Sequence, residues 1–405
     1  MKLPFCDPET QKNFSVSSHT SCSQESANVQ KVAYSSQGEK YPARKPYYSA
    51  LDGLRGIAAI AVMIFHFSEV LFLYSTMRNP LIHCWLAVDF FFCLSGFVIA
   101  HAYDQRMKTI GLGRFFLNRL IRLHPLVIIG SIIGVIAYAA DPFLYTPLVA
   151  GLKKVLFTFF LSLLMIPTPY LQYRSSALFP YNGPTWSLFF EYIINVIYAF
   201  ALSSVARRWL VFIGALSAAF LIYVVQGSGQ FHGGWSAENY MHGFARVGYS
   251  FIVGLLIFRY HLTFRHRLGF LLPCFILIVV LLSPHYPSDW KMELFFVMLI
   301  LPIVVCVGAG ANTSGLTERL CKFLGRISYP LYMTHMPTVL LFRNYFHKIN
   351  PTNDELIVVA VFLIVFSLLF AYVIMRWIDE PVRKWLNSVS KKTLQFLKKV
   401  SKMGY

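Results

Sequence analysis

Long apolar runs recur along most of this sequence, and they constrain its fold more than any other feature. A helix needs about 20 apolar residues to cross the hydrocarbon core of a membrane. Runs of suitable length lie at 53–74, 84–103, 123–140, 185–205, 209–226, 241–258, 268–283, 291–310, 327–343 and 354–376. Of the 405 residues, 56% are hydrophobic and only 13% are charged. The sequence therefore predicts an all-α fold, a polytopic helical bundle in a membrane, and excludes an ordinary soluble enzyme.

A further candidate at 151–171 decides how many runs span the membrane. It begins with two lysines and has two prolines near its end, and proline disrupts helices. If this segment spans, the basic segments at 207–208, 259–267 and 318–326 and the basic C-terminal tail fall outside, against the positive-inside rule. If this segment does not span the membrane, the same basic segments lie in the cytosol. We therefore expect about ten transmembrane helices, one re-entrant or interfacial segment at 151–171, and both termini in the cytosol.

Positive charge is the second notable feature, and it lies between the apolar runs. The chain has 36 lysines and arginines against 18 acidic residues, a net charge of +18. This placement favours a topology signal and contacts with membrane lipids over nucleic-acid binding. Residues 1–48 are polar and rich in serine, so we expect them to form a disordered cytosolic tail. One membrane domain at 49–386 and a basic cytosolic tail at 387–405 complete the expected organisation.

Ionisable side chains inside apolar runs are costly in a membrane and are therefore candidates for function. The first run carries Arg55 and, eleven positions later, His66. Eleven steps of about 100° bring the two side chains within about 20° of one helix face and about 16 Å apart along the axis. This geometry predicts a site that begins at the cytosolic mouth of the helix and reaches His66 near the middle of the membrane.

The residues around Arg55 also form a distinctive motif, Leu-Asp-Gly-Leu-Arg-Gly at 51–56. Together with His66, this motif resembles the signature of the acyltransferase family 3 membrane O-acyltransferases. Other segments resemble the motifs of that family in the same order, so that the resemblance extends over about 49–386. They are Phe91–Phe97, Arg114–Pro125, Trp186–Glu191, Gly325–His335 and Glu380–Arg383. Some members add a C-terminal esterase-like domain, and we expect none to be fused here.

This resemblance implies an enzyme that transfers an acyl group to a hydroxyl group. The donor is acyl-CoA, usually acetyl-CoA, taken from the cytosol, and no cofactor is bound permanently. The implied acceptor is an exported or cell-surface glycan or a lipid-linked sugar, such as lipopolysaccharide O-antigen or exopolysaccharide, and the implied location is the bacterial inner membrane. A small molecule such as a macrolide is a second class of acceptor. The formation of a homo-oligomer stays open.

Catalytic roles then fall to His66, Arg55 and Glu191. Because an imidazole titrates near neutral pH, His66 can accept the proton of an acceptor hydroxyl, and an acyl-histidine intermediate is the alternative. Arg55 would contact the donor or the thioester carbonyl, unless it only reaches toward lipid headgroups. Glu191 would orient His66 or bind sugar hydroxyls, unless it is the structural partner of a buried cation.

Donor binding is expected from basic and polar residues in three of the motifs. Guanidinium groups suit the phosphates of CoA, although an arginine cluster beside the membrane also serves as a lipid anchor. The polar residues of the 325–335 segment fit either a donor channel or a polar network in the core. The residues assigned to donor binding are Arg55, Arg114, Arg119, Arg122, Ser328, Tyr329 and His335.

Three further expectations concern packing, metals and an alternative function. Ser95 and Gly96 favour close helix packing over a nucleophilic role, and Glu380 and Arg383 would fasten the C-terminal segment. No metal site is expected, because the histidines show no spacing of the His-Glu-x-x-His kind. A proton-coupled secondary transporter is the alternative from another class, since a proton relay also needs ionisable groups in the membrane.

Overall fold

The computed structural model describes four stretches of this protein, residues 46–144, 151–168, 177–286 and 289–402. The chain divides into two units, Met1–Tyr47 and Tyr48–Tyr405. Nearly all of the first unit lies outside the described residues, and so do residues 1–45 of the disordered tail expected at 1–48.

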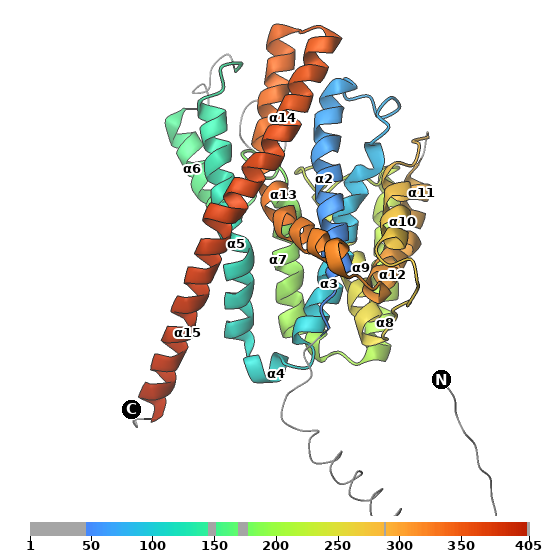
Figure 1. Ribbon diagram of the computed structural model, residues 1–405, viewed down its shortest axis with the longest axis vertical. Coiled ribbons are helices and arrows are strands. Elements are labelled where there is room, and N and C mark those ends of the chain that lie inside the picture. The colour runs from blue at the N-terminus through green and yellow to red at the C-terminus, as the bar shows by residue number, and fades with distance from the viewer. Residues whose placement is uncertain (1–45, 145–150, 169–176, 287–288, 403–405) are drawn as a thin grey trace, which may run out of the picture. The chain divides into compact units, whose positions relative to one another are not determined.

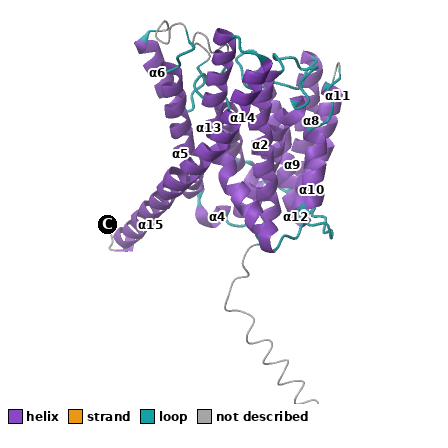
Figure 2. Ribbon diagram, turned by 45° about the horizontal axis from the view of Figure 1, so that its top comes forward, coloured by secondary structure: helices purple, strands orange, loops and turns teal. Residues whose placement is uncertain are grey.

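The second unit is built from helices (Figure 1). Its described residues contain no strand, only two isolated bridges between single residues (Figure 2). The predicted all-α class is therefore confirmed for the described part of the chain. Four helices belong neither to the long apolar segments nor to the shorter apolar helices of the next paragraph. They are α4 (Met107–Ile110), α6 (Leu152–Leu163), η2 (Leu202–Ser204) and α13 (Gly315–Ile349).

Among the described residues, seven helical segments are long and apolar enough to cross a membrane. Two shorter apolar helices are α7 (Thr185–Phe200) and α10 (Leu271–Leu281). The seven are α2 (Ser49–Leu71), η1 with α3 (Ile82–Leu86 and Ala87–Tyr103), α5 (Leu112–Ala139), α8 (Arg207–Ser228), α9 (Tyr240–Arg259), α11 with η3 and α12 (Trp290–Phe295, Phe296–Ile300 and Leu301–Gly310), and α14 with η4 and the start of α15 (Asn353–Ile374, Met375–Asp379 and Glu380–Lys402). The protein is an integral membrane protein.

The disputed segment at 151–171 forms α6, which has only 12 residues. The helix ends at Leu163, before Pro167, and several of its apolar side chains are exposed, among them Leu156, Phe157 and Phe160. At 1.5 Å per residue, such a helix reaches about 18 Å, which is less than the hydrocarbon thickness of about 30 Å.

The central packing of the bundle joins α2 to α13, the longest helix (Figure 1). Glycines let the two backbones come close: a Cβ on Gly56 would lie 2.4 Å from Cβ of Leu324, and one on Gly325 would lie 2.5 Å from Cβ of Asp52. Any larger residue at these positions would push the helices apart. This contact fixes the helix that carries Arg55 and His66.

A second close contact joins α3 to α9. A Cβ on Gly96 would lie 2.0 Å from the carbonyl oxygen of Phe251, and one on Gly254 would lie 2.0 Å from the carbonyl oxygen of Cys93. The expectation that Gly96 serves helix packing is therefore confirmed. Small residues at such crossings are typical of helix pairs in membranes.

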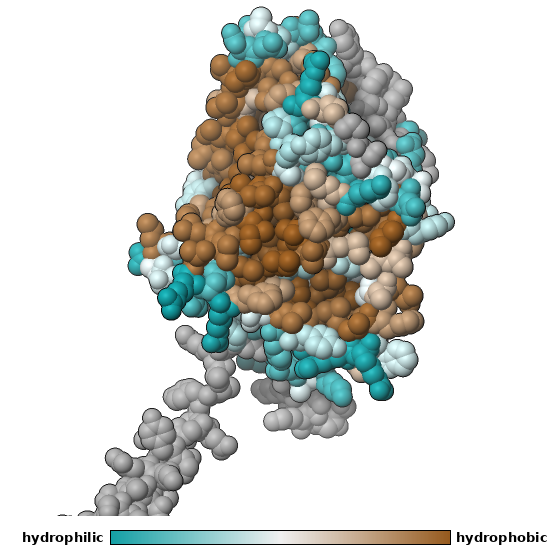
Figure 3. Space-filling model, turned by 90° about the vertical axis from the view of Figure 1, so that its right-hand side faces the viewer, coloured by the Kyte–Doolittle hydropathy of each residue, from teal (hydrophilic) through white to brown (hydrophobic). Residues whose placement is uncertain are grey.

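The outer surface of the bundle is apolar between two hydrophilic ends. On the face that Figure 3 shows, a broad apolar area separates polar groups at the top from polar groups at the bottom. Large apolar side chains are exposed on the outer helices, including Phe212 and Tyr223 of α8 and Leu271 and Phe275 of α10. Such a surface is stable against lipid and would be costly in water.

Candidate active site

A cavity of about 370 Å³ opens between α2, η1, α9, α13 and the segment that precedes α7. Its walls are mainly apolar and aromatic, with Phe65, Trp85, Trp186 and Trp235 among them. A few polar groups converge on this space. They are His66, Glu69, His232, Arg246, Tyr332 and Arg343. This combination of apolar walls and a few polar side chains is typical of small-ligand sites.

His66 forms a pair with Glu69, one helical turn further along α2. Its Nδ1 lies 2.7 Å from Oε2 of Glu69, and both side chains are partly exposed in the cavity wall. A carboxylate can only accept a hydrogen bond, so Nδ1 carries a proton, and in the neutral imidazole Nε2 then keeps its lone pair. The carboxylate therefore holds the imidazole in the tautomer that a general base requires.

A second imidazole lies against the first. The rings of His66 and His335 stack with their centroids 5.5 Å apart, and His335 is fully buried in α13. Nδ1 of His335 donates to the carbonyl of Leu331, 2.9 Å away. Close by, the hydroxyls of Ser187 and Tyr332 share a hydrogen bond of 2.8 Å. Of His335, Ser187 and Tyr332, only Tyr332 is among the described residues that line the cavity, and the other two lie behind its wall.

Another part of the wall is formed by Arg246, which belongs to a buried ion pair. Arg246 of α9 donates to both carboxylate oxygens of Asp89 on α3, with the shortest distance 2.7 Å, and neither side chain is more than 1% exposed. The guanidinium also donates to the carbonyl of Gly233, 2.7 Å away, and lies over the rings of Trp186 and Phe231. The bidentate geometry and the carbonyl satisfy most of its donors, so that the charge is tolerated inside the bundle.

His232, in the loop between α8 and α9, lines the cavity beside these groups. Its ring stacks on that of Trp85 with the centroids 4.3 Å apart. Desolvation inside the cavity, followed by the positive charge of Arg246, lowers the pKa of His232 to about 3. The side chain is therefore neutral at physiological pH and adds a hydrogen-bonding group without a charge.

Glu191 does not reach His66. Its Oε1 accepts hydrogen bonds from Nη2 of Arg119, 2.7 Å away, and from Oγ of Ser95, 2.9 Å away. Arg119 lies on α5 and is buried. The structure therefore places Glu191 as the partner of a buried cation, which was the structural alternative for this residue. Neither Glu191 nor Arg119 is among the described residues that line the cavity.

Arg55 lies away from the cavity, toward the first turns of α2. Its Nη1 is 3.0 Å from Oδ1 of Asp52, and it is not among the described residues of the cavity wall. As the helix geometry requires, the ten residues between Arg55 and His66 form an unbroken helix. The pair therefore lies on one helix with only His66 at the cavity.

The family can be identified once this geometry is known. Residues 48–376, most of the chain, match a family whose model is described as an acyltransferase domain. The chain belongs to acyltransferase family 3. As a family 3 acyltransferase it is an enzyme, so the transporter alternative is not retained.

Two curated relatives illustrate the range of the family. The acyltransferase is 34% identical over 181 residues to a Rhizobium radiobacter protein named "Protein 2 in picA locus", which covers 42% of this chain and 91% of the relative. It is 25% identical over 374 residues to the peptidoglycan O-acetyltransferase OatA of Listeria monocytogenes, which covers 84% of this chain and 56% of OatA. The chain thus spans little more than half the length of OatA. No solved structure matches the acyltransferase.

The other residues assigned to donor binding, including His335, are not among the described residues that line the cavity. Oγ of Ser328 donates to the carbonyl of Gly325 in its own helix, and the hydroxyl of Tyr329 donates to the carbonyl of Leu123 on α5. Arg114 hydrogen-bonds Ser390 of α15, and Arg122 is exposed. The contacts of Tyr329 and Arg114 join helices to one another.

The C-terminal motif of the acyltransferase also makes contacts that fasten helices. Glu380 pairs with Arg326 of α13, and Arg383 pairs with Asp379 one turn earlier. These ion pairs agree with the expectation that Glu380 and Arg383 fasten the C-terminal segment.

Sequence reasoning missed four residues of the site, namely Glu69, Asp89, His232 and Arg246. Three of them are ionisable groups in apolar surroundings, the signal that had identified His66. Glu69 could have been found because it lies three residues after His66, and side chains at this spacing share a helix face. His232 lies in a loop, where periodicity gives no signal. Next to Trp85, a group of possible metal ligands also meets, namely His83, His285 and Asp289.

Proposed function

We propose that this acyltransferase moves an acetyl group from acetyl-CoA to a hydroxyl group of an exported or cell-surface glycan, with His66 as the general base. The observation that carries the proposal is the pairing of His66 with Glu69 in the wall of a cavity of about 370 Å³. A volume in the range of about 300–1,000 Å³ suits a small organic ligand or one part of a larger one. The name of the relative OatA supports an O-acetyl transfer and a glycan acceptor.

The reaction follows from the tautomer of His66. Nε2 takes the proton of the acceptor hydroxyl while the hydroxyl oxygen attacks the carbonyl carbon of the thioester. The Glu69 carboxylate stabilises the imidazolium that forms. The carbon–sulfur bond then breaks, and His66 returns the proton to the departing sulfur, which leaves CoA as the thiol and the acceptor as an ester.

The proposed topology brings the two substrates from opposite sides of the membrane. We count the seven long spans together with α7, α10 and α13 as ten crossings. We leave α6 out, because an eleventh crossing would place the basic segments at 207–208, 259–267 and 318–326 outside. Ten crossings place both termini in the cytosol, in agreement with the charges of the loops. Arg55 then lies nearer the cytosol than His66, by about 16 Å along α2. The donor would approach past Arg55 and Arg122, and the acceptor would enter the cavity from the outer side of a bacterial inner membrane.

A transfer assay with the purified full chain in proteoliposomes tests this proposal. Radiolabelled acetyl-CoA is supplied with a polysaccharide fragment, a lipid-linked sugar or a macrolide, and labelled ester is measured. General-base catalysis contributes about 10²–10⁴-fold, so His66→Ala should lose activity by about that factor. The matched control is His261→Asn, because His261 is exposed and lies outside the cavity. Wild-type rates in His66→Ala would overturn the catalytic assignment, and transfer to the macrolide alone would overturn the glycan acceptor.

A further inference from the structure

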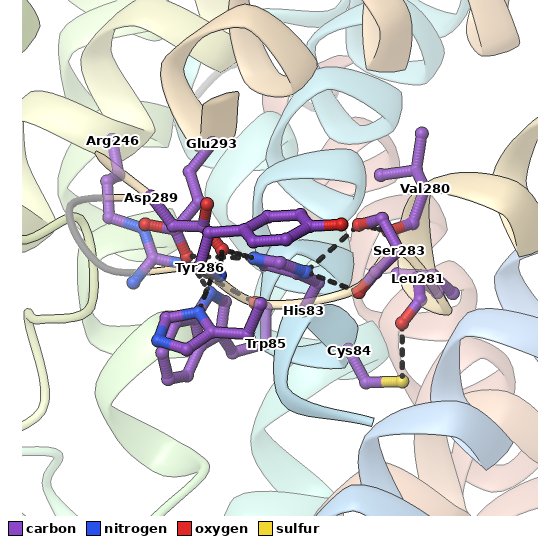
Figure 4. A network of polar contacts seen from close by, with 11 residues as sticks. His83, Cys84, Trp85, Arg246, Val280, Leu281, Ser283, Tyr286, Asp289 and Glu293 are labelled. Atoms are coloured by element: carbon purple, nitrogen blue, oxygen red, sulfur yellow. Dashed lines mark hydrogen bonds and ion pairs between the residues drawn. The ribbon is translucent and has the colours of Figure 1, made fainter. Parts of the chain in front are cut away.

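A second cluster of ionisable groups lies beside the cavity, outside the proposed acyl-transfer machinery (Figure 4). It joins η1 to the segment between α10 and α11, through His83 on one side and His285 and Asp289 on the other. One ligand atom from each of these three residues lies within 4.8 Å of the others. Glu293 of α11 adds a second carboxylate, with Oε1 3.9 Å from Nε2 of His83.

His83 has a fixed tautomer. The residue is fully buried, and its Nδ1 lies 2.9 Å from the carbonyl oxygen of Ser283. Because a carbonyl only accepts, Nδ1 carries a proton and donates it there. Metal-bound histidines commonly donate their second ring nitrogen to a backbone carbonyl in this way, which leaves the other nitrogen as the ligand.

The free nitrogen of His83 points into a group of acceptors. Nε2 lies 3.3 Å from Oδ2 of Asp289, yet it makes no hydrogen bond to any described residue. Nδ1 of His285 lies 2.9 Å from the same oxygen and is likewise buried without a hydrogen bond among the described residues. A protonated ring aligned with Asp289 would hydrogen-bond at these distances, so neither nitrogen points straight at the carboxylate.

The misalignment is what a shared metal ion requires. In a tetrahedral site with bonds of about 2.0–2.1 Å, neighbouring ligand atoms lie about 3.3 Å apart, and each lies about 35° off the lone-pair axis of the next. The observed separations of 2.9 and 3.3 Å lie close to this value. Two nitrogen lone pairs and a carboxylate that face one another also need a positive charge between them.

We propose that His83, His285 and Asp289 bind a divalent zinc ion, with a water molecule at the fourth position. Imidazole nitrogens favour zinc over magnesium or calcium, which prefer oxygen ligands only. The ion joins η1 to the start of α11. Glu293 also accepts a hydrogen bond of 2.7 Å from Nε1 of Trp85, a residue of the cavity wall. Glu293, 3.9 Å from His83, thereby connects the proposed metal site to Trp85 at the edge of the active-site cavity.

The surroundings of the cluster support a built site. The backbone amide of Tyr286 donates to Oδ2 of Asp289 at 2.7 Å, and Oγ of Ser283 lies 2.9 Å from Nδ1 of His83. These partners orient two of the ligands from behind, as the outer groups of metal sites do. Residues 200 positions apart in the sequence are thus arranged around one point.

Metal analysis of the purified full chain tests the proposal without relying on activity. The protein is stripped with a chelator, incubated with zinc and desalted, and bound zinc is measured by mass spectrometry. We expect about one zinc ion per chain. His285→Ala and Asp289→Asn should each lower the bound zinc at least tenfold, whereas His261→Asn should retain it. Equal zinc in wild type and Asp289→Asn would overturn the proposal.

Cobalt provides a second measurement that needs no variant. Co²⁺ in a tetrahedral site of nitrogen and oxygen ligands absorbs visible light much more strongly than hydrated Co²⁺. The stripped wild-type protein should gain this absorption on adding one equivalent of Co²⁺, and zinc should remove it. If the absorption does not appear, the cluster is a hydrogen-bonded ion-pair network with a protonated histidine, and the metal assignment is wrong.

Discussion

Two of the buried arginine–carboxylate pairs among the described residues of this acyltransferase occupy different surroundings. Arg246 and Asp89, the cavity pair, are at most 1% exposed, and Arg246 lines the cavity that His66 also lines. Arg119 and Glu191, the interior pair, are 7% and 18% exposed and connect α5 to α7 away from that wall. A buried charge in a membrane helix therefore marks a polar network. Only its position relative to a cavity distinguishes a functional site from a contact that holds helices together.

Removing the arginine of the cavity pair should have the largest effect on stability. Arg246→Met leaves Asp89 buried without its partner, and breaking a buried pair costs about 3–5 kcal/mol. Thermal unfolding in detergent, followed by size-exclusion chromatography, measures the loss. The double variant Arg246→Met with Asp89→Leu should recover much of it, because no unpaired charge is left. A single variant as stable as wild type would show that the pair does not stabilise the bundle.

The largest expected effect on catalysis after His66 itself comes from the carboxylate of Glu69. Glu69→Gln removes the charge that stabilises the imidazolium but keeps the shape of the side chain, so kcat should fall about 10²-fold with little change in stability. Transfer of labelled acetyl groups measures kcat, and His261→Asn is again the matched control. Unchanged kcat would mean that His66 does not depend on Glu69.

The interior pair supplies the contrasting case. Glu191→Gln weakens the charged hydrogen bonds to Arg119 and Ser95, and should lower stability by about 2 kcal/mol. Because the pair lies outside the cavity wall, kcat per folded molecule should change less than about threefold. A loss of kcat like that of Glu69→Gln, at normal stability, would return Glu191 to the catalytic role that its sequence motif first indicated.

Much of the fold was accessible from the sequence, because apolar length and periodicity are local properties. The runs at 53–74 and 241–258 correspond to α2 and α9, within a few residues. The run at 327–343 was found as well, but it is the apolar part of the 35-residue helix α13, whose polar first turns no apolar pattern could reveal.

Contacts between residues on different helices could not be predicted from the sequence in the same way. Ser95 and Glu191 are 96 positions apart, and His83 and Ser283 are 200 apart, so only the packing of the helices decides that they meet. Spacing motifs detect metal sites on one helix or one loop, which is why the histidines gave no metal signal in the sequence. Glu69, by contrast, was within reach, since its partner lies one turn away.

The smallest expected effect concerns His232, a residue of the cavity wall whose protonation affects stability. Its pKa in the fold is lowered to about 3, whereas a histidine in the unfolded chain titrates near 6.5. Above pH 6.5 both states are neutral and the shift has no effect on stability. As the pH falls below 6.5, the unfolded chain binds a proton that the fold does not, and stability drops by up to about 1.4 kcal/mol per pH unit. His232→Gln removes this term. The difference in melting temperature between pH 7.5 and pH 5.5 should therefore be smaller in the variant than in wild type or in His261→Asn, and an equal difference would mean that His232 is solvated and titrates normally.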